Sequence, residues 1–296
     1  MESRNKITLP YSLTVPPLGK VILEYLPEGS KRITLFFAGE HIRPEAQTGI
    51  AVDGSILMAP WYGGPAQRGE ANLVALAAQK IGSYLARRVD DDGNTSLVYW
   101  GTGPAGDAVE VIGALTAYQV EQYAFDPPGA FGPRANLLPA VRYFVERFAQ
   151  AKWGMFVFFT QGIIHDIEAV KSYTAALAAQ IASGSRNELK LVLIGVGKNI
   201  DRAHLEALDS LDTGTAVDLW DYRLAPEMRN VLELFTEVGD SQTIICPAGA
   251  VLDPSGNILA DYHAQGLPAR ISFTLPAALK SFVVDMAGAR IEQRIP

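Results

Sequence analysis

The sequence of 296 residues is long enough for one large domain or two small ones, and 48% of its residues are hydrophobic. A formal net charge of −7 and the lack of a lysine and arginine run argue against a nucleic-acid partner, because neutralising phosphates needs a clustered basic surface. The N-terminus lacks a signal-peptide pattern, the apolar stretches are too short to span a bilayer, and a single cysteine cannot form an internal disulfide. We therefore expect a cytoplasmic protein without a membrane partner.

The first 48 residues have the pattern of short β-strands. Runs rich in β-branched and aromatic residues are separated by proline and glycine turns. The expected strands are Lys6–Leu9, Ser12–Val15, Lys20–Tyr25 and Arg32–Ala38.

Residues 49–238 alternate between strand and helix patterns. The expected strands are Gly49–Val52, Ser96–Trp100, Val109–Leu115, Trp153–Thr160, Lys190–Val196 and Trp220–Leu224. Helical spacing of apolar residues covers Ala71–Arg88, Leu137–Ala151, Asp166–Ser183, Asp201–Asp209 and Pro226–Glu237. This alternation predicts an α/β domain with a doubly wound, mostly parallel sheet and helices on both faces, and ligands bind at the carboxyl edge of such sheets.

Residues 239–296 return to a strand pattern. The expected strands are Thr243–Cys246, Ala250–Leu252, Ile258–Tyr262, Ile271–Leu275, Ser281–Met286 and Ala289–Ile295. Neither end of the chain is long enough for a core of its own. We therefore predict that residues 1–48 and 239–296 together form one β-sandwich beside the α/β domain.

The segment Asp53-Gly54-Ser55 directly follows the first strand of the α/β region. A carboxylate and a hydroxyl two residues apart on a strand-end loop suit a divalent cation, which prefers oxygen ligands. The same residues also suit a tight turn, in which the aspartate accepts hydrogen bonds from its own backbone.

The α/β region resembles a von Willebrand factor A (vWA) domain. Asp53-Gly-Ser-Ile-Leu57, followed by Met58, occupies the place of the family's Asp-x-Ser-x-Ser motif. Phe158–Gly162 resembles the strand that ends in Thr-Asp-Gly, and Leu191–Gly197 resembles the segment that ends in Ile-Gly-Val-Gly. The resemblance covers about residues 48–238. The segments Asn136–Phe144 and Asp212–Asp221 extend it to a bacterial subgroup.

The resemblance implies a metal-ion-dependent adhesion site that this chain has in part. Asp53 and Ser55 match two of the family's ligands. Leu57 replaces the second serine, Ala135 replaces the threonine and Gln161 replaces the second aspartate. We expect a vestigial site in which any Mg²⁺ binding is weak, and no other cofactor.

A glycine-rich segment, Gly101–Gly106, matches the G-x-G-x-x-G pattern of nucleotide-binding loops. Phosphate binding also needs a helix N-terminus after the loop, and Asp107–Ile112 has the pattern of a strand. A turn between two strands is therefore the favoured interpretation. A nucleotide-dependent enzyme that uses this loop stays open as an alternative function.

The carboxyl edge is the expected partner-binding surface. His165-Asp166 lies there, although adjacent residues point apart and Asp166 is expected to cap the following helix instead of acting in catalysis. The aromatic residues of this edge either anchor a partner or cover the sheet as local core. The predicted edge consists of Trp61, Tyr62, Ala135, Asn136, Gln161 and His165.

The sequence thus predicts a non-catalytic protein-interaction module. The vWA resemblance implies that its protein partner belongs to a larger bacterial assembly. Apart from the enzyme, the remaining alternative is a structural subunit of a homo-oligomer.

Overall fold

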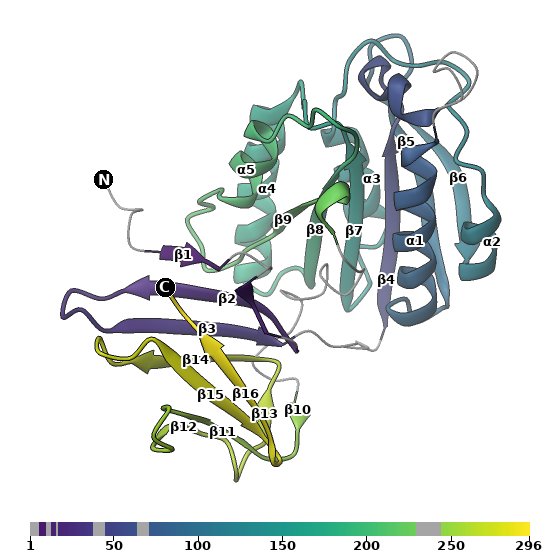
Figure 1. Ribbon diagram of the computed structural model, residues 1–296. Coiled ribbons are helices and arrows are strands. Elements are labelled where there is room, and N and C mark those ends of the chain that lie inside the picture. Colours follow the sequence, from purple (N-terminus) through teal and green to yellow (C-terminus); the bar gives the residue numbers. More distant parts are fainter. Residues whose placement is uncertain (1–5, 10–12, 16, 38–44, 64–70, 229–243) are drawn as a thin grey trace. The chain divides into compact units, whose positions relative to one another are not determined.

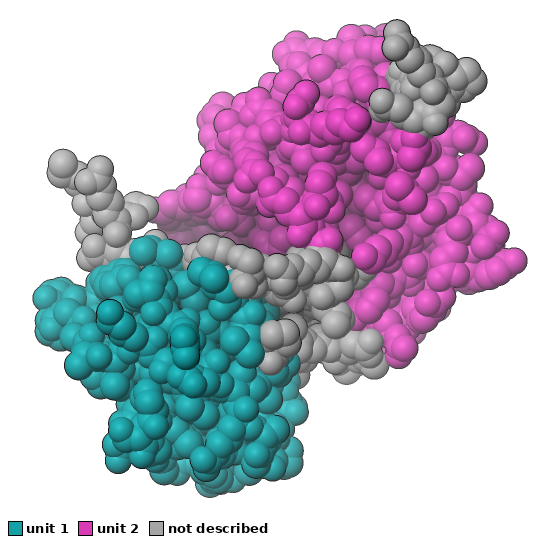
Figure 2. All heavy atoms as spheres, viewed as in Figure 1, with its two compact units in different colours: residues 1–41, 232–296 teal, residues 42–231 magenta. Residues whose placement is uncertain are grey.

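The computed structural model describes residues 6–9, 13–15, 17–37, 45–63, 71–228 and 244–296. The chain divides into two compact units, which are residues 1–41 with 232–296 and residues 42–231, and Figure 2 colours them separately. We call them unit 1 and unit 2. None of the helices in the described ranges is long and apolar enough to cross a membrane.

Unit 2 is built on a six-stranded sheet with the order β6-β5-β4-β7-β8-β9. All neighbouring pairs are parallel except β5 and β6, which are antiparallel. This confirms the predicted mixed α/β region with a mostly parallel central sheet. The strands are β4 (Ala46–Asp53), β5 (Asn94–Thr102), β6 (Ala108–Thr116), β7 (Trp153–Thr160), β8 (Glu188–Gly195) and β9 (Trp220–Leu224).

Helices cover the two faces of this sheet. Figure 1 shows α1 on one face and α3 and α4 on the other. The apolar side of α3, α4 and α5 belongs to one core cluster with alternate residues of the central strands, such as Phe156 and Phe158. The helices are α1 (Leu73–Arg88), α2 (Ala117–Gln122), α3 (Leu138–Arg147), α4 (Ile167–Ala182) and α5 (Ala203–Asp209), with short 3-10 helices at η2 (Ile56–Tyr62) and η4 (Ala225–Glu227).

Unit 1 joins the two ends of the chain. Strand β14, near the C-terminus, pairs with β3, near the N-terminus, and a second four-stranded sheet shares its apolar cluster with the first. The first sheet contains β1 (Lys6–Thr8), β2 (Leu18–Tyr25), β3 (Lys31–Phe37) and β14 (Arg270–Leu275). The second contains β12 (Ile258–Asp261), β11 (Gly249–Leu252), β15 (Ser281–Met286) and β16 (Ala289–Arg294), while β10 (Ile244–Cys246) pairs with β13 (Leu267–Pro268).

Several segments differ from the sequence predictions, among them the short strand β13 and the 3-10 helix η2, neither of which was predicted. No strand forms at residues 13–15, because the buried Gln293 side chain accepts a hydrogen bond from the Val15 amide and donates one to the Leu13 carbonyl. The helix predicted over Pro226–Glu237 begins as the 3-10 turn η4 and is extended at Met228, and its remainder lies outside the described residues. Helix α2 was not predicted, although Thr116 and Gln119 form a capping box at its start.

A close contact fixes α3 on the sheet. A Cβ atom at Gly49, on β4, would overlap the Phe144 ring of α3. That ring is fully buried and stacks on Phe156 of β7, with 4.8 Å between ring centroids. The absence of a side chain on the central strand therefore sets how closely the helix approaches.

We predict that Gly49→Ala lowers the free energy of unfolding by about 1–3 kcal/mol, because neither the central strand nor the stacked ring has room to move. The same substitution in a Phe144→Leu background should cost less, because a smaller side chain leaves space. Urea unfolding of the four proteins of this cycle measures the coupling. Gly129→Ala is the control, since nothing lies within 4 Å of its added Cβ. Equal costs in the two backgrounds would contradict the contact.

Candidate functional site

The candidate site lies where the strand order of the sheet reverses. Strands β5 and β6 follow β4 on one side, and β7 and β8 lie on the other. Ligands of doubly wound sheets bind in the crevice at the carboxyl ends of the strands beside such a reversal. In this chain β4 ends at Asp53 and β7 ends at Thr160. Val52 is paired with Phe159, so these two polar residues come next on neighbouring strands.

Asp53 connects the ends of β4 and β7 from inside the protein. Its side chain is buried, with 1% of the residue exposed. One carboxylate oxygen, Oδ1, accepts a hydrogen bond from the Ser55 amide at 2.8 Å, and Oδ2 accepts one from the Thr160 hydroxyl at 3.2 Å. The Tyr62 hydroxyl donates to the Asp53 carbonyl at 2.7 Å. Burial raises the pKa of Asp53 to about 7, and the hydrogen bonds from Ser55 and Thr160 oppose this rise.

Two further oxygens, on residues that closely follow Asp53 and Thr160 in the chain, have no hydrogen-bond partner in the part of the chain that the structure describes. They are Ser55 Oγ and Gln161 Oε1, and both atoms are buried. Buried polar atoms without partners are rare and often mark a bound water or ion. Ser55 Oγ and Gln161 Oε1 are therefore the two atoms, besides the Asp53 carboxylate, that a divalent cation could use as ligands.

The residues do not fit a tightly held divalent cation. Mg²⁺ favours carboxylate ligands, and Asp53 offers one carboxylate that is already hydrogen-bonded and whose pKa is raised to about 7. Leu57 packs against the core cluster, and Ala135 is fully buried in it. Within the described ranges, no group of three or more histidine, cysteine, aspartate or glutamate side chains is placed to hold a metal.

The glycine-rich segment Gly101–Gly106 is a turn from β5 into antiparallel β6. All three of its glycines have φ between 68° and 76°, which side-chain-bearing residues rarely adopt. A Cβ atom at Gly106 would overlap the Arg134 backbone, and one at Gly132 would overlap the Gly101 carbonyl. The glycines therefore allow two loops to pack backbone against backbone. No helix N-terminus follows the loop to bind a phosphate.

His165 and Asp166 hold the returning loop in place. The His165 side chain accepts a hydrogen bond from the Ala135 amide through Nδ1 at 3.0 Å, and the His165 amide donates to the Ala135 carbonyl at 2.9 Å. The Asp166 carboxylate accepts hydrogen bonds from the Leu137 and Leu138 amides, at 2.8 and 2.9 Å. Asp166 occupies the N-cap position of α4, as predicted, but its carboxylate accepts hydrogen bonds from the first amides of α3 and not from those of its own helix.

The aromatic residues predicted at the edge differ in their exposure. Tyr62 is buried, and its ring lies 5.7 Å from that of Phe131 and 6.5 Å from that of Tyr99, so it supports the loop as core. Trp61 is half-buried, and its ring fills the space that a side chain at Gly197 would need. The burial of Tyr62 agrees with the core interpretation, whereas Trp61 is partly exposed.

Most of the exposed side chains of the edge are not among the residues that the sequence predicts there. Ile56, which directly follows Ser55 at the start of η2, is 54% exposed, and Pro133, Arg134 and His165 are exposed as well. Asn136 is half-buried and donates to the Ala105 carbonyl at 3.1 Å. The role of Thr160 was also missed. The pairing of β4 with β7 places Thr160 beside Asp53. This pairing depends on the order of the strands in the sheet, which cannot be deduced from local sequence patterns.

The chain was compared with known proteins. Neither the protein-family models nor the curated proteins contain a match to the sequence. Among solved structures, the VWA domain of SpRpn10 is similar with 15% identity and a TM-score of 0.41, covering 64% of this chain and 93% of that one. The PilB minor pilin from Streptococcus sanguinis has 13% identity and a TM-score of 0.40, covering 79% of this chain and 76% of that one. The pilus adhesin SpaC from Lactobacillus rhamnosus GG has 12% identity and a TM-score of 0.37, and this chain covers 47% of its length. Similarities of this size assign no family.

The burial of Asp53 predicts a pH dependence of stability. Its pKa in the folded chain, about 7, lies above the ordinary value of 3.8, so the protonated form favours folding and this contribution is lost as the pH rises from about 4 to about 7. The loss amounts to at most about 4 kcal/mol. Asp53→Asn removes the titration. The free energy of unfolding of the variant minus that of the native chain should therefore rise over this pH range.

Urea unfolding between pH 4 and pH 8, with a chelator present, measures this difference. Taking the difference cancels the other shifted carboxyls, including Asp90, whose pKa burial also raises, and Asp253, whose pKa hydrogen bonds lower. A difference that stays constant with pH would show that Asp53 is ionised in the folded chain throughout.

Proposed function

We propose that this chain is a non-catalytic protein-interaction module whose unit 2 is a vWA-type domain that recognises its partner without a metal ion. One observation carries the proposal. Asp53, the carboxylate at the reversal of strand order, is engaged in internal hydrogen bonds, whereas Ile56, Pro133 and Arg134 are exposed around it. Partner recognition by apolar and arginine side chains is typical of protein interfaces.

The vWA assignment of unit 2 is supported by the place of the Asp53–Leu57 motif. The motif begins at the carboxyl end of a central parallel strand, beside the Thr160-Gln161-Gly162 segment that follows β7. The β-sandwich assignment of unit 1 is supported by the apolar cluster that its two four-stranded sheets share. The domain boundaries at residues 48 and 238 stay a prediction.

The absence of catalysis is supported by the roles of the candidate groups. His165 Nδ1 and the Asp166 carboxylate are both occupied by backbone amides of the 135–138 segment. The Gly101–Gly106 loop leads into a strand, which disfavours the nucleotide-dependent enzyme.

The proposed partner is a protein in a larger bacterial assembly, and the proposed location is the cytoplasm, where the free thiol of Cys246 stays reduced. The homo-oligomeric subunit remains the second candidate. Light scattering that reports a monomer at all concentrations would exclude it.

The proposal predicts that a photoreactive phenylalanine placed at Ile56 crosslinks a discrete partner protein in a lysate of the source cells, with or without a chelator. The same group at Ala182 is the matched control, because this exposed position ends α4 just before the amino end of β8. Mass spectrometry of the products identifies the partner. Identical products from both positions, or loss of the Ile56 product with the chelator, would contradict recognition by a metal-independent carboxyl edge.

A further inference from the structure

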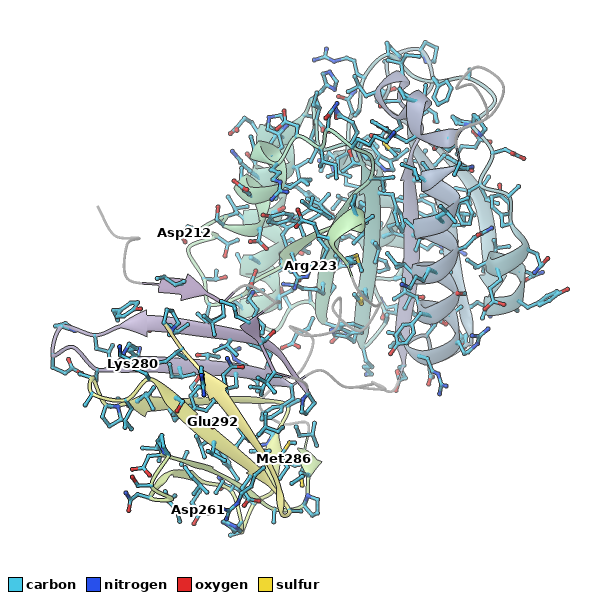
Figure 3. All side chains as sticks on the ribbon, viewed as in Figure 1. Asp212, Arg223, Asp261, Lys280, Met286 and Glu292 are labelled. Atoms are coloured by element: carbon cyan, nitrogen blue, oxygen red, sulfur yellow. The ribbon has the colours of Figure 1, made fainter. Side chains whose placement is uncertain are left out.

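Strand β6 has an edge that is unpaired within the part of unit 2 that the structure describes. This strand ends the six-stranded sheet, and no strand in the described ranges pairs with its outer side. The strand at the opposite edge, β9, carries the paired charges of Asp221 and Arg223, the latter labelled in Figure 3. Charged pairs of this kind discourage the addition of another strand. Along β6, Glu110 is the one charged residue.

The side of β6 that faces α3 is apolar. Val109 and Val111 pair with Trp100 and Val98, which belong to the cluster packed under α3, so both valines lie on that face of the sheet. Val111 is 52% exposed. The pairing of β6 with β5 is regular from Val109 to Val111, and its register shifts on either side, between Ala108 and Val109 and between Val111 and Gly113.

A groove of about 710 Å³ runs beside this stretch. Its floor includes Val109, Leu138 and Tyr143, all of which are half-buried. Its rim carries Asp107, Arg142 and Glu146. An open strand edge next to a groove with an apolar floor is the geometry that binds an extended peptide, because the backbone pairs with the edge and alternate side chains enter the groove.

The charged side chains along the rim of the groove determine which charge a bound segment should carry. The Arg142 guanidinium lies over the Tyr173 ring, 5.3 Å from its centroid. The Asp166 carboxylate, at one end of the groove, is occupied by the amides of α3. Asp107 and Glu146 are exposed and form no ion pair in the described part of the chain. Two carboxylates against the single cation Arg142 leave these three rim residues with a net charge of −1 (−2 + 1), which favours a cationic occupant.

We propose that the open edge of β6, at Ala108–Val111, and the groove beside it bind an extended segment of a partner protein in which apolar residues alternate with lysine or arginine. The segment adds to the sheet next to β6. Its apolar side chains cover Val109 and Val111, and its cationic groups meet Asp107 and Glu146. The groove adjoins the candidate site through Asn136 and Asp166. The inference nevertheless rests on β6 and α3, and it does not depend on what the loops around Ile56 bind.

The test uses a fluorescein-labelled seven-residue peptide of alternating valine and lysine, whose fluorescence anisotropy is measured against the full chain. It should bind about fivefold to tenfold more tightly than the peptide with glutamate in place of lysine, which is the effect of two partly exposed ion pairs. An Asp107→Lys, Glu146→Lys double variant should lose this preference. Hydrogen exchange should slow at the amides of β6.

Three controls separate the mechanism from general charge attraction. A Glu206→Lys, Glu227→Lys double variant makes the same charge change at exposed positions of α5 and η4 and should bind normally. An Ile56→Ala variant should also bind normally, which keeps this surface distinct from the carboxyl edge. A lysine peptide N-methylated at alternate residues should lose binding, because it cannot pair with a strand. Equal binding of the lysine and glutamate peptides, full binding by the methylated peptide, or no binding at about 1 mM peptide would overturn the proposal.

Discussion

The buried Asp53 carboxylate is the constraint on which the arrangement of the carboxyl edge depends. A carboxyl group with 1% exposure is costly unless its oxygens are hydrogen-bonded or it takes up a proton. Here the Ser55 amide and the Thr160 hydroxyl supply the hydrogen bonds, from the loop after β4 and from the end of β7. Satisfying one buried group therefore connects the two central strands at the place where the sheet reverses its order.

The neighbouring loops are held by the same kind of interaction. Tyr62 donates to the Asp53 carbonyl, and a bridge between Ser55 and Gly132 brings in the returning loop. His165 and Asp166 then bind the amides at the end of that loop. Asp53, His165 and Asp166, which a sequence would assign to metal binding or catalysis, thus accept hydrogen bonds from backbone amides. The exposed side chains of this edge include Ile56, Pro133, Arg134 and His165.

The parts of the fold that follow from local pattern were predictable. Helices α1, α3 and α4 have apolar residues at helical spacing, and β7 and residues 191–194 of β8 are apolar runs, so their positions follow from local pattern. Helix α2 is too short for periodicity, although its capping box is readable in the sequence. The side chains of the candidate site were harder to predict, because their roles depend on distant neighbours. Asp166 caps a helix that begins 28 residues before it, and Tyr62 is buried against a ring 37 residues away.

Calorimetric titration with Mg²⁺ and Mn²⁺, on the native chain beside the Asp53→Asn variant, tests most directly whether this edge works without a cation. Our account predicts no binding of either ion at concentrations below about 1 mM, and identical traces for the two proteins. Micromolar binding by the native chain that disappears in the variant would contradict it, because Asp53 would then be a metal ligand and not an internal hydrogen-bond acceptor.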